Sequence, residues 1–376
     1  MQSRKEQIFT AALFCGFLAV MLLLYLVLPK IPFSQQEKRY LAEKPELSWK
    51  SLLSGDFGQE METYLADHIP GRNLFVGLNS VYDLASGRQI TKDVRLLPGG
   101  RLAEAPVRWN EAQVRKNLSA ISAFSENLGQ AVDLMIVPSA GWAAQDRAIT
   151  GLDLFSREQY TDAEIISQIY QLCEGSVRGF DACQVLSGHE EYYYSTDHHW
   201  NSQGAYQVYS AYMASLGKDH PSADAFTVET VEGFYGSTYT RSGLWHIPGE
   251  TLELWHSGSE LTVTNADAGE PHPGVFYRER LAEHDKYTVY LDGNHSLVRI
   301  ENPAMEGKGK ILVIRDSYMN SMGIFLAESY ETVVLADLRY YKNPVSQLCQ
   351  QEDFDTILIC YSIGNFMTDT NLIWLR

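Results

Sequence analysis

One long apolar segment constrains this chain more than any other feature. Residues 8–28 (IFTAALFCGFLAVMLLLYLVL) form an uncharged run of 21 residues. A helix needs about 20 apolar residues to cross a bilayer, whereas the apolar part of a cleaved signal peptide is usually about 7–15 residues long. No small-residue cleavage pattern follows the run. We therefore predict an uncleaved membrane anchor at residues 1–30, with a cleaved signal peptide as the alternative.

The charges beside the run do not set its orientation. Basic residues lie on both sides of it: Arg4 and Lys5 before, and Lys30, Lys38, Arg39 and Lys44 after. A long domain can nevertheless be translocated regardless of these short-range charges. We expect a single-pass protein of the cell membrane whose C-terminal domain is extracytoplasmic.

Composition excludes several classes of protein. The chain has 376 residues, of which 45% are apolar and 20% charged, as in ordinary globular proteins. Its net charge of −17 argues against a nucleic-acid partner, because no basic field offsets the phosphates. Five cysteines without C-x-x-C spacing exclude a disulfide-built scaffold. Cys15 lies in the anchor, Cys349 and Cys360 look like core thiols, and Cys173 could pair with Cys183 outside the cell.

After the anchor, the pattern predicts an α/β domain. Short apolar runs bounded by turn residues alternate with segments of helical spacing, which indicates a mainly parallel sheet with flanking helices. The predicted strands are residues 132–137, 309–315, 331–335 and 355–361, and the predicted helices are 109–128, 162–173 and 202–216. We assign residues 31–95 to a stalk and helical lead-in, 96–224 and 301–376 to the two parts of the α/β domain, and 225–300 to a β-rich insert.

The segment 195–201 (STDHHWN) carries the strongest chemical signal. In acyl transfer, a histidine takes a proton from a serine while a carboxylate orients the imidazole. In metal chemistry, the same carboxylate and imidazoles would be ligands. We expect the adjacent rings of His198 and His199 to point apart, which disfavours one shared metal. A capping Asp197, a structural histidine and a buried Trp200 remain the non-functional alternative.

A serine follows one of the predicted strands. Ser317 comes directly after the strand that ends near Ile314, and a helix is expected to begin there. Open α/β sheets place ligands at this end of their strands. A helix N-terminus also offers backbone N–H groups to an oxyanion. A simple N-cap is the competing interpretation.

A third segment, residues 361–366 (YSIGNF), follows the last strand. Gly364 and the amide of Asn365 could complete an oxyanion hole, although a Gly-Asn turn explains them as well. Together the three segments would supply a nucleophile, a base, its orienting carboxylate and an oxyanion donor.

Several stretches resemble a known family. The tetrad Asp197-His198-His199-Trp200 spells the signature of the DHHW protein family, which is found mainly in Gram-positive bacteria. Further stretches that look like this family are GQEMETYLADHIPGRN (58–73), FYGSTYTRSG (234–243), VYLDGNHSLVRIEN (289–302), RDSYMNS (315–321) and ADLRYY (336–341). The family is similar to the alginate acetylation proteins, whose catalytic domain has a rearranged SGNH hydrolase fold.

This resemblance implies a catalytic triad. In the alginate acetylation proteins a D-x-H-W motif supplies the aspartate and histidine, and a later G-D-S motif supplies the serine. The carry-over makes Ser317 the nucleophile, His199 the general base and Asp197 its orienting carboxylate. Arg315 stands where the glycine of G-D-S would be, and Asn365 matches the SGNH asparagine.

We therefore expect an O-acetyltransferase of the cell envelope that acts on a cell-surface or secreted polysaccharide. The resemblance implies an acetyl donor delivered by a membrane-bound acyltransferase. The Ser317 N–H, with Asn365, would hold the oxyanion, and Arg315 or Arg339 would orient an anionic sugar unless they serve only the surface or the edge of the core. We recognise no cofactor site and no metal site. A carbohydrate esterase, a non-catalytic glycan-binding or assembly protein and a metal-dependent hydrolase are the alternatives.

Overall fold

The computed structural model describes residues 4–376 except residues 35, 89, 145–158 and 268. The chain forms two compact units. The first is Met1–Ser86 with Gly243–Trp245, and the second is Gly87–Ser242 with His246–Arg376.

The first unit contains the apolar helix. Helix α1 (Arg4–Val27) has a mean hydropathy of 2.5 over its most apolar window and is long enough to cross a membrane. The remaining elements of this unit are β1 (Phe33–Ser34), β2 (Arg39–Tyr40), α2 (Trp49–Ser54), α3 (Asp56–Asp67) and α4 (Arg72–Ala85). Asp67 accepts hydrogen bonds from Arg39 Nη1 at 2.8 Å and from the Ala42 amide at 2.9 Å. The lead-in after α1 is thus hydrogen-bonded to the end of α3.

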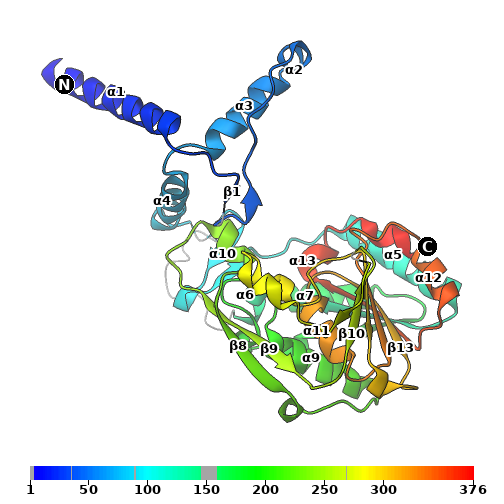
Figure 1. Ribbon diagram of the computed structural model, residues 1–376. Helices are drawn as coiled ribbons and strands as arrows, with labels where there is room; N and C mark the ends of the chain where they lie inside the picture. The colour runs from blue at the N-terminus through cyan, green and yellow to red at the C-terminus, as the bar shows by residue number, and fades with distance from the viewer. Residues whose placement is uncertain (1–3, 35, 89, 145–158, 268) are drawn as a thin grey trace. The chain divides into compact units, whose positions relative to one another are not determined.

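An eight-stranded sheet forms the centre of the second unit, in the order β11-β10-β12-β14-β13-β15-β6-β7 (Figure 1). Its strands are β6 (Val132–Val137), β7 (Val177–Phe180), β10 (Thr262–Asn265), β11 (His272–Pro273), β12 (Leu297–Glu301), β13 (Lys310–Arg315), β14 (Thr332–Ala336) and β15 (Thr356–Ser362). The five strands from β14 to β7 are parallel. The predicted mainly parallel α/β sheet is confirmed.

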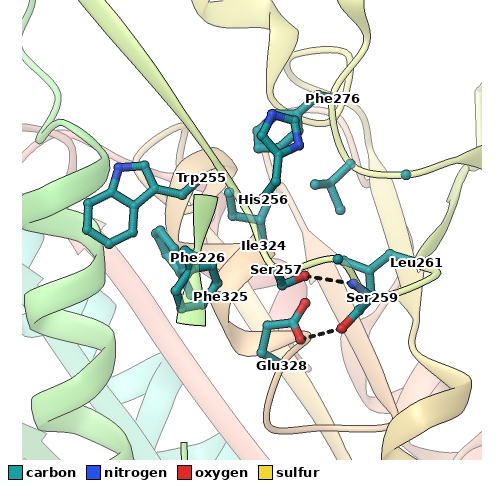
Figure 2. Close-up of a pocket in the computed structure, with 13 residues that line it drawn as sticks. Phe226, Trp255, His256, Ser257, Ser259, Leu261, Phe276, Ile324, Phe325 and Glu328 are labelled. Atoms are coloured by element: carbon teal, nitrogen blue, oxygen red, sulfur yellow. Dashed lines mark hydrogen bonds between the residues drawn. The ribbon is translucent and has the colours of Figure 1, made fainter. Parts of the chain in front are cut away.

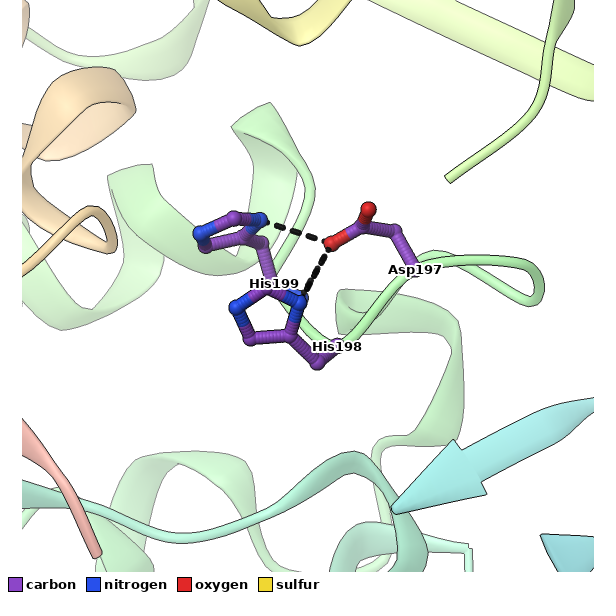
Figure 3. Close-up of side chains that lie close together, drawn as sticks. All are labelled: Asp197, His198 and His199. Atoms are coloured by element: carbon purple, nitrogen blue, oxygen red, sulfur yellow. Dashed lines mark hydrogen bonds and ion pairs between the residues drawn. The ribbon is translucent and has the colours of Figure 1, made fainter. Parts of the chain in front are cut away.

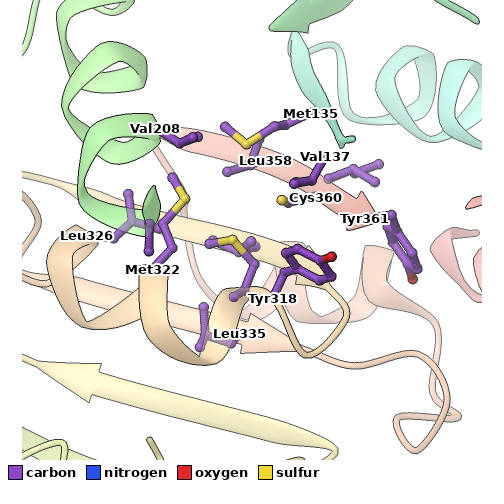
Figure 4. Packing of buried hydrophobic residues seen from close by; sticks show 14 of the residues in the cluster. Met135, Val137, Val208, Tyr318, Met322, Leu326, Leu335, Leu358, Cys360 and Tyr361 are labelled. Carbon is purple, nitrogen blue, oxygen red and sulfur yellow. The ribbon is translucent and has the colours of Figure 1, made fainter. Parts of the chain in front are cut away.

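Both faces of this sheet are covered. Every residue of β6, β14 and β15 is buried, and successive strand residues point to opposite faces. Helices α9 (Ser202–Ser215) and α11 (Met319–Leu326) pack together on one face, where Val208, Met322 and Leu326 meet Leu358 and Met135 (Figure 4). Helices α5 (Glu111–Leu128) and α12 (Val345–Gln351) cover the other face (Figure 1).

Smaller elements surround the sheet. They are β3 (Ile90–Thr91), β4 (Val94–Leu96) and β5 (Leu102–Glu104), which form a three-stranded sheet, and the helices α6 (Ala140–Ala143), α7 (Asp162–Gln171), α8 (Cys183–Leu186), α10 (Ser237–Ser242) and α13 (Ile363–Phe366). The 3-10 helix η6 (Lys286–Val289) precedes β12.

Residues 225–300 are rich in strands, but they do not all stand apart from the α/β body. Strands β8 (Thr227–Phe234) and β9 (Glu250–His256) form a separate antiparallel pair. Strands β10 and β12 extend the main sheet, because β12 pairs antiparallel with β14. Residues 225–300, which we predicted from sequence to be a β-rich insert, therefore supply one edge of the main sheet.

The cysteines form no disulfide bond. All five are free, and burial raises the pKa of Cys173 to about 11. Cys173 and Cys183 are therefore separate thiols, whereas Cys360 lies in the core as expected.

Candidate active site

Three side chains from two distant segments of the sequence meet beside the sheet. The Oγ of Ser317 lies 2.7 Å from Nε2 of His199, and Nδ1 of His199 lies 2.7 Å from Oδ1 of Asp197. All three residues are at most 9% exposed. The structure thus brings together the serine, imidazole and carboxylate that the sequence singled out, in an order in which the imidazole can accept the serine proton while the carboxylate orients it.

Ser317 is held by the loop between β13 and α11. Its neighbour Asp316 accepts a hydrogen bond from the Tyr318 amide at 3.1 Å through Oδ1. Its other oxygen accepts from the Ser362 amide and from Asn365 Nδ2, both at 2.8 Å. Asp316 therefore joins the end of β13 to the end of β15. The Ser317 hydroxyl does not cap α11, since its described hydrogen bond goes to His199.

The tetrad is fixed by its own neighbours. Trp200 Nε1 lies 3.0 Å from both the Tyr318 carbonyl oxygen and Ser321 Oγ, so the indole ties this segment to α11. Asn201 is the N-cap of α9 and accepts from the Gly204 amide at 2.9 Å. Because Asn201 has the capping role, the capping alternative for Asp197 does not hold.

Gly236 and Ser237 also hold Asp197, although no role was assigned to them from sequence. Oδ2 of Asp197 accepts from the Ser237 amide at 2.6 Å. A Cβ atom on Gly236 would lie 2.2 Å from Asp197 Cβ, so only glycine fits there. The stretch FYGSTYTRSG contains both residues, but nothing in its pattern says which carboxylate it meets.

The two histidines turn toward the same oxygen (Figure 3). His198 Nδ1 lies 3.0 Å from Asp197 Oδ1, and the two ring centroids are 3.8 Å apart. The expectation that the rings point apart is wrong, because one carboxylate oxygen and the Ser237 hydroxyl, 2.7 Å from His198 Nδ1, draw that ring inward.

This group also offers atoms of the kind that bind metals. Among the described residues, Asp197, His198 and His199 have ligand atoms within 4.8 Å of one another. The ligands of a tetrahedral zinc, at about 2.0 Å from the ion, are about 3.3 Å apart. The N–O separations of 2.7 and 3.0 Å are those of hydrogen bonds. His199 Nε2 is also already engaged by Ser317. The geometry therefore favours proton transfer over metal binding.

The pKa values of both Asp197 and His199 are lowered, for different physical reasons. Burial alone would raise the pKa of Asp197, but the imidazoles of His198 and His199 hold it well below the usual range. Burial and the neighbouring His198 lower the pKa of His199, despite the opposing attraction of Asp197. The lowered pKa favours the neutral form of His199, in which Nδ1–H donates to Asp197 and Nε2 can accept the proton of Ser317.

Tyr287 forms one wall of the site, and sequence reasoning did not single it out. Its ring stacks on His199 with centroids 4.1 Å apart and planes 6° apart. Its hydroxyl donates to the Ser317 carbonyl oxygen at 3.3 Å. A single tyrosine in η6 carries no local signal of this role, because the contact depends on how η6 packs against α11.

The residues that the sequence suggested for substrate or oxyanion binding are Arg315, Arg339 and Asn365, and the structure gives each a different environment. The Arg315 side chain is fully buried and donates to Asn294 Oδ1 at 3.0 Å, so it cannot meet a polymer at the surface. Arg339 is partly exposed and paired with Asp337 at 2.6 Å. Asn365 uses one amide N–H for Asp316 and keeps a second. Among the described residues, no hydrogen bond from the Ser317 amide is found.

A separate cavity of about 180 Å³ lies away from this group (Figure 2). Aromatic side chains line it, together with Ser259, which donates to Glu328 at 2.7 Å. Glu328 follows the C-terminal end of α11, whereas Ser317 precedes its N-terminus. The cavity is therefore not the place where Ser317 would meet a substrate.

Comparisons with known proteins agree with this fold. A model of the DHHW protein family matches residues 124–336, which is more than half of the chain. No match was found among curated proteins. A DHHW family protein from Eubacterium siraeum is 19% identical with a TM-score of 0.65, and the alignment covers 76% of this chain and 95% of that one.

A second solved structure is similar over the same part of the chain. PatB1 from Bacillus cereus is 20% identical with a TM-score of 0.60, and the alignment covers 73% of this chain and 97% of that one. PatB1 has also been solved with a sulfonyl adduct. These likenesses show a shared fold, and the mainly parallel α/β sheet with flanking helices predicted from sequence is confirmed.

Proposed function

The chain belongs to the DHHW protein family, and from this premise we propose that it is an O-acetyltransferase that works through an acetyl-enzyme. The observation that carries the proposal is the pair of 2.7 Å contacts that link Ser317, His199 and Asp197. A binding protein has no need of a buried serine hydroxyl aligned with a neutral imidazole.

The first half-reaction would load Ser317. Its Oγ attacks the carbonyl carbon of an acetyl donor while its proton passes to His199 Nε2. The Ser317 amide and the second N–H of Asn365 are the donors available for the oxyanion. When the tetrahedral intermediate collapses, His199 returns the proton to the leaving group, and the acetyl group stays on Ser317. Asp197 stabilises the imidazolium in between.

The second half-reaction would transfer the acetyl group from Ser317 to the acceptor. A sugar hydroxyl loses its proton to His199 Nε2 and attacks the acetyl carbon. The bond to Ser317 Oγ then breaks, and the proton on His199 passes to that oxygen. The acetylated sugar leaves and the starting state returns. Water in place of the sugar would make the same site an esterase.

The acceptor and the donor follow from the proposed location. The resemblance to alginate acetylation proteins supports a polysaccharide acceptor, and α1 supports attachment to the membrane. Acetyl-coenzyme A does not occur outside the cell. We therefore infer that a membrane-bound acyltransferase delivers the acetyl group to the extracytoplasmic domain.

The test uses the full chain in detergent micelles. The protein would be incubated with para-nitrophenyl acetate, with and without a chitooligosaccharide, and the products read by mass spectrometry. We expect an acetyl group on Ser317 in the wild type, none in Ser317→Ala, and transfer to the sugar. Ser187→Ala, which changes an exposed serine, is the matched control.

The outcomes separate the candidates. Serine-dependent release of acetate without sugar acetylation would favour the esterase. A folded wild type that neither turns over the ester nor forms a sulfonyl adduct with a sulfonyl fluoride would contradict a nucleophilic Ser317; PatB1 has been solved with a sulfonyl adduct.

A further inference from the structure

We propose that His198 is a positioning residue of the same site, which holds a positive charge against Asp197 and so keeps its neighbour His199 neutral. The inference rests on the proposed function, in which His199 must accept a proton from Ser317. His198 itself makes no described contact with Ser317. Its role would be exerted through the shared carboxylate.

The geometry of the shared carboxylate carries the inference. Oδ1 of Asp197 accepts from the His199 amide at 3.0 Å, and it lies 2.7 Å from His199 Nδ1 and 3.0 Å from His198 Nδ1. A single carboxylate charge therefore faces two imidazoles. Only one of them can be protonated without strong repulsion, because the ring centroids are 3.8 Å apart.

Exposure decides which ring takes the proton. The His198 side chain is 21% exposed, whereas that of His199 is 6% exposed. An imidazolium costs less free energy at the more hydrated position. His199 also gains Ser317 as a partner only while its Nε2 is unprotonated. Both effects place the positive charge on His198.

Other charged and titratable groups face the pair from neighbouring elements. Glu104 of β5 and Arg241 of α10 act on His198 with opposite signs, and they pair with each other at 2.7 Å. Asp316, after β13, favours the protonated form of His199. The phenols Tyr287 and Tyr318 pack against the rings, but burial keeps both neutral by raising the pKa of each well above its usual value.

Together these groups raise the pKa of His198 and lower the pKa of His199. Burial opposes charge on His198, but Asp197 outweighs it and raises the pKa of His198. The pKa of His199 is lowered by burial and then by the charge on His198. Without His198, the full charge of Asp197 would act on His199 alone. The pKa of His199 should then rise, and the base would be protonated over a wider range of pH.

Titration of the imidazole rings by NMR tests this in the full chain in detergent micelles. The histidine rings are labelled with 13C, and the two signals are assigned from their loss in His198→Gln and His199→Gln. In the wild type we expect His198 to titrate above His199. In His198→Gln we expect the pKa of His199 to rise by about half a unit or more.

Ser237→Ala is the matched control. It removes the hydroxyl 2.7 Å from His198 Nδ1 but keeps the imidazole and its charge, so the order of the two titrations should stay as in the wild type. If His199 titrates above His198 in the wild type, the proposal is overturned even if His198→Gln fails to fold. An unchanged or lowered pKa of His199 in a folded His198→Gln would overturn it as well.

Ester hydrolysis by the same proteins links the charge to the reaction. The rate falls as pH drops through the pKa of His199, because the protonated ring cannot accept the proton of Ser317. In His198→Gln the acid limb of kcat/KM should therefore move to higher pH, in step with the NMR titration. Absence of turnover with the expected titrations would count against the proposed function and not against the charge on His198.

Discussion

Asp197 connects the residues of the site through its two carboxylate oxygens. Oδ1 faces the two histidines, and Oδ2 accepts from the Ser237 amide at 2.6 Å. Because both oxygens are engaged, the carboxylate is restrained from rotating about its Cβ–Cγ bond. A fixed carboxylate in turn fixes the tautomer and the plane of His199, which is what a general base requires.

Gly236→Ala tests how tightly this carboxylate is held. The new Cβ would lie 2.5 Å from Asp197 Cα, so the backbone of the tetrad must move. We expect ester hydrolysis to fall about 100-fold, as for other displacements of about 1 Å. The free energy of unfolding should fall by about 1–3 kcal/mol. Both are measured against Gly58→Ala, where nothing lies within 4 Å. Equal activity of the two variants would contradict the close contact.

Two elements far apart in the chain form the site. The tetrad precedes α9, and Ser317 precedes α11, which packs against α9. Trp200 joins them, since its Nε1 meets both the Tyr318 carbonyl and Ser321 Oγ at 3.0 Å. The indole is fully buried, so water could not take over its N–H as the donor to these two acceptors.

Trp200→Phe should loosen this connection. The change removes the N–H that these two buried acceptors share, which costs about 1–3 kcal/mol. We expect a lower thermal unfolding midpoint and slower acetylation of Ser317. Trp49→Phe is the control, because Trp49 is 81% exposed. If Trp200→Phe unfolds and reacts like Trp49→Phe, the indole is not what aligns the two elements.

At the scale of the whole molecule, an apolar helix precedes a domain that folds around its own sheet. Helix α1 has no buried residue in its most apolar window, whereas β13 and β15 are buried almost throughout. Apolar side chains exposed along a full helix need a non-aqueous environment. We propose that α1 lies in the membrane and that the sheet domain carries out the chemistry outside the cell.

Alkaline extraction of membranes tests the anchor. We expect the full chain to stay in the membrane pellet, and its N-terminal peptides to be found intact by mass spectrometry. A chain lacking residues 1–30 should be recovered without detergent. Recovery of a shortened, freely soluble chain from cells that express the full sequence would instead show that the run is a cleaved signal peptide.

Much of the sheet could be read from local sequence. Residues 132–137 and 309–315 are short apolar runs between turn residues, and the structure has strands at Val132–Val137 and Lys310–Arg315. These strands are buried on both faces, so nearly every residue in them is apolar. The antiparallel strands β10 and β12 were less clear, because their alternation does not say which strand they pair with.

The sequence by itself determined the apolar helix, the central strands and the residue types of the site, because each depends on composition over a few neighbouring positions. Tertiary structure decided the rest. His199 and Ser317 are 118 residues apart and meet only because α9 packs on α11. The inward turn of His198, the stacking of Tyr287 and the burial of Arg315 also depend on packing between distant elements. No local pattern specifies such contacts, since the free energy that fixes them arises only when the sheet and its helices assemble.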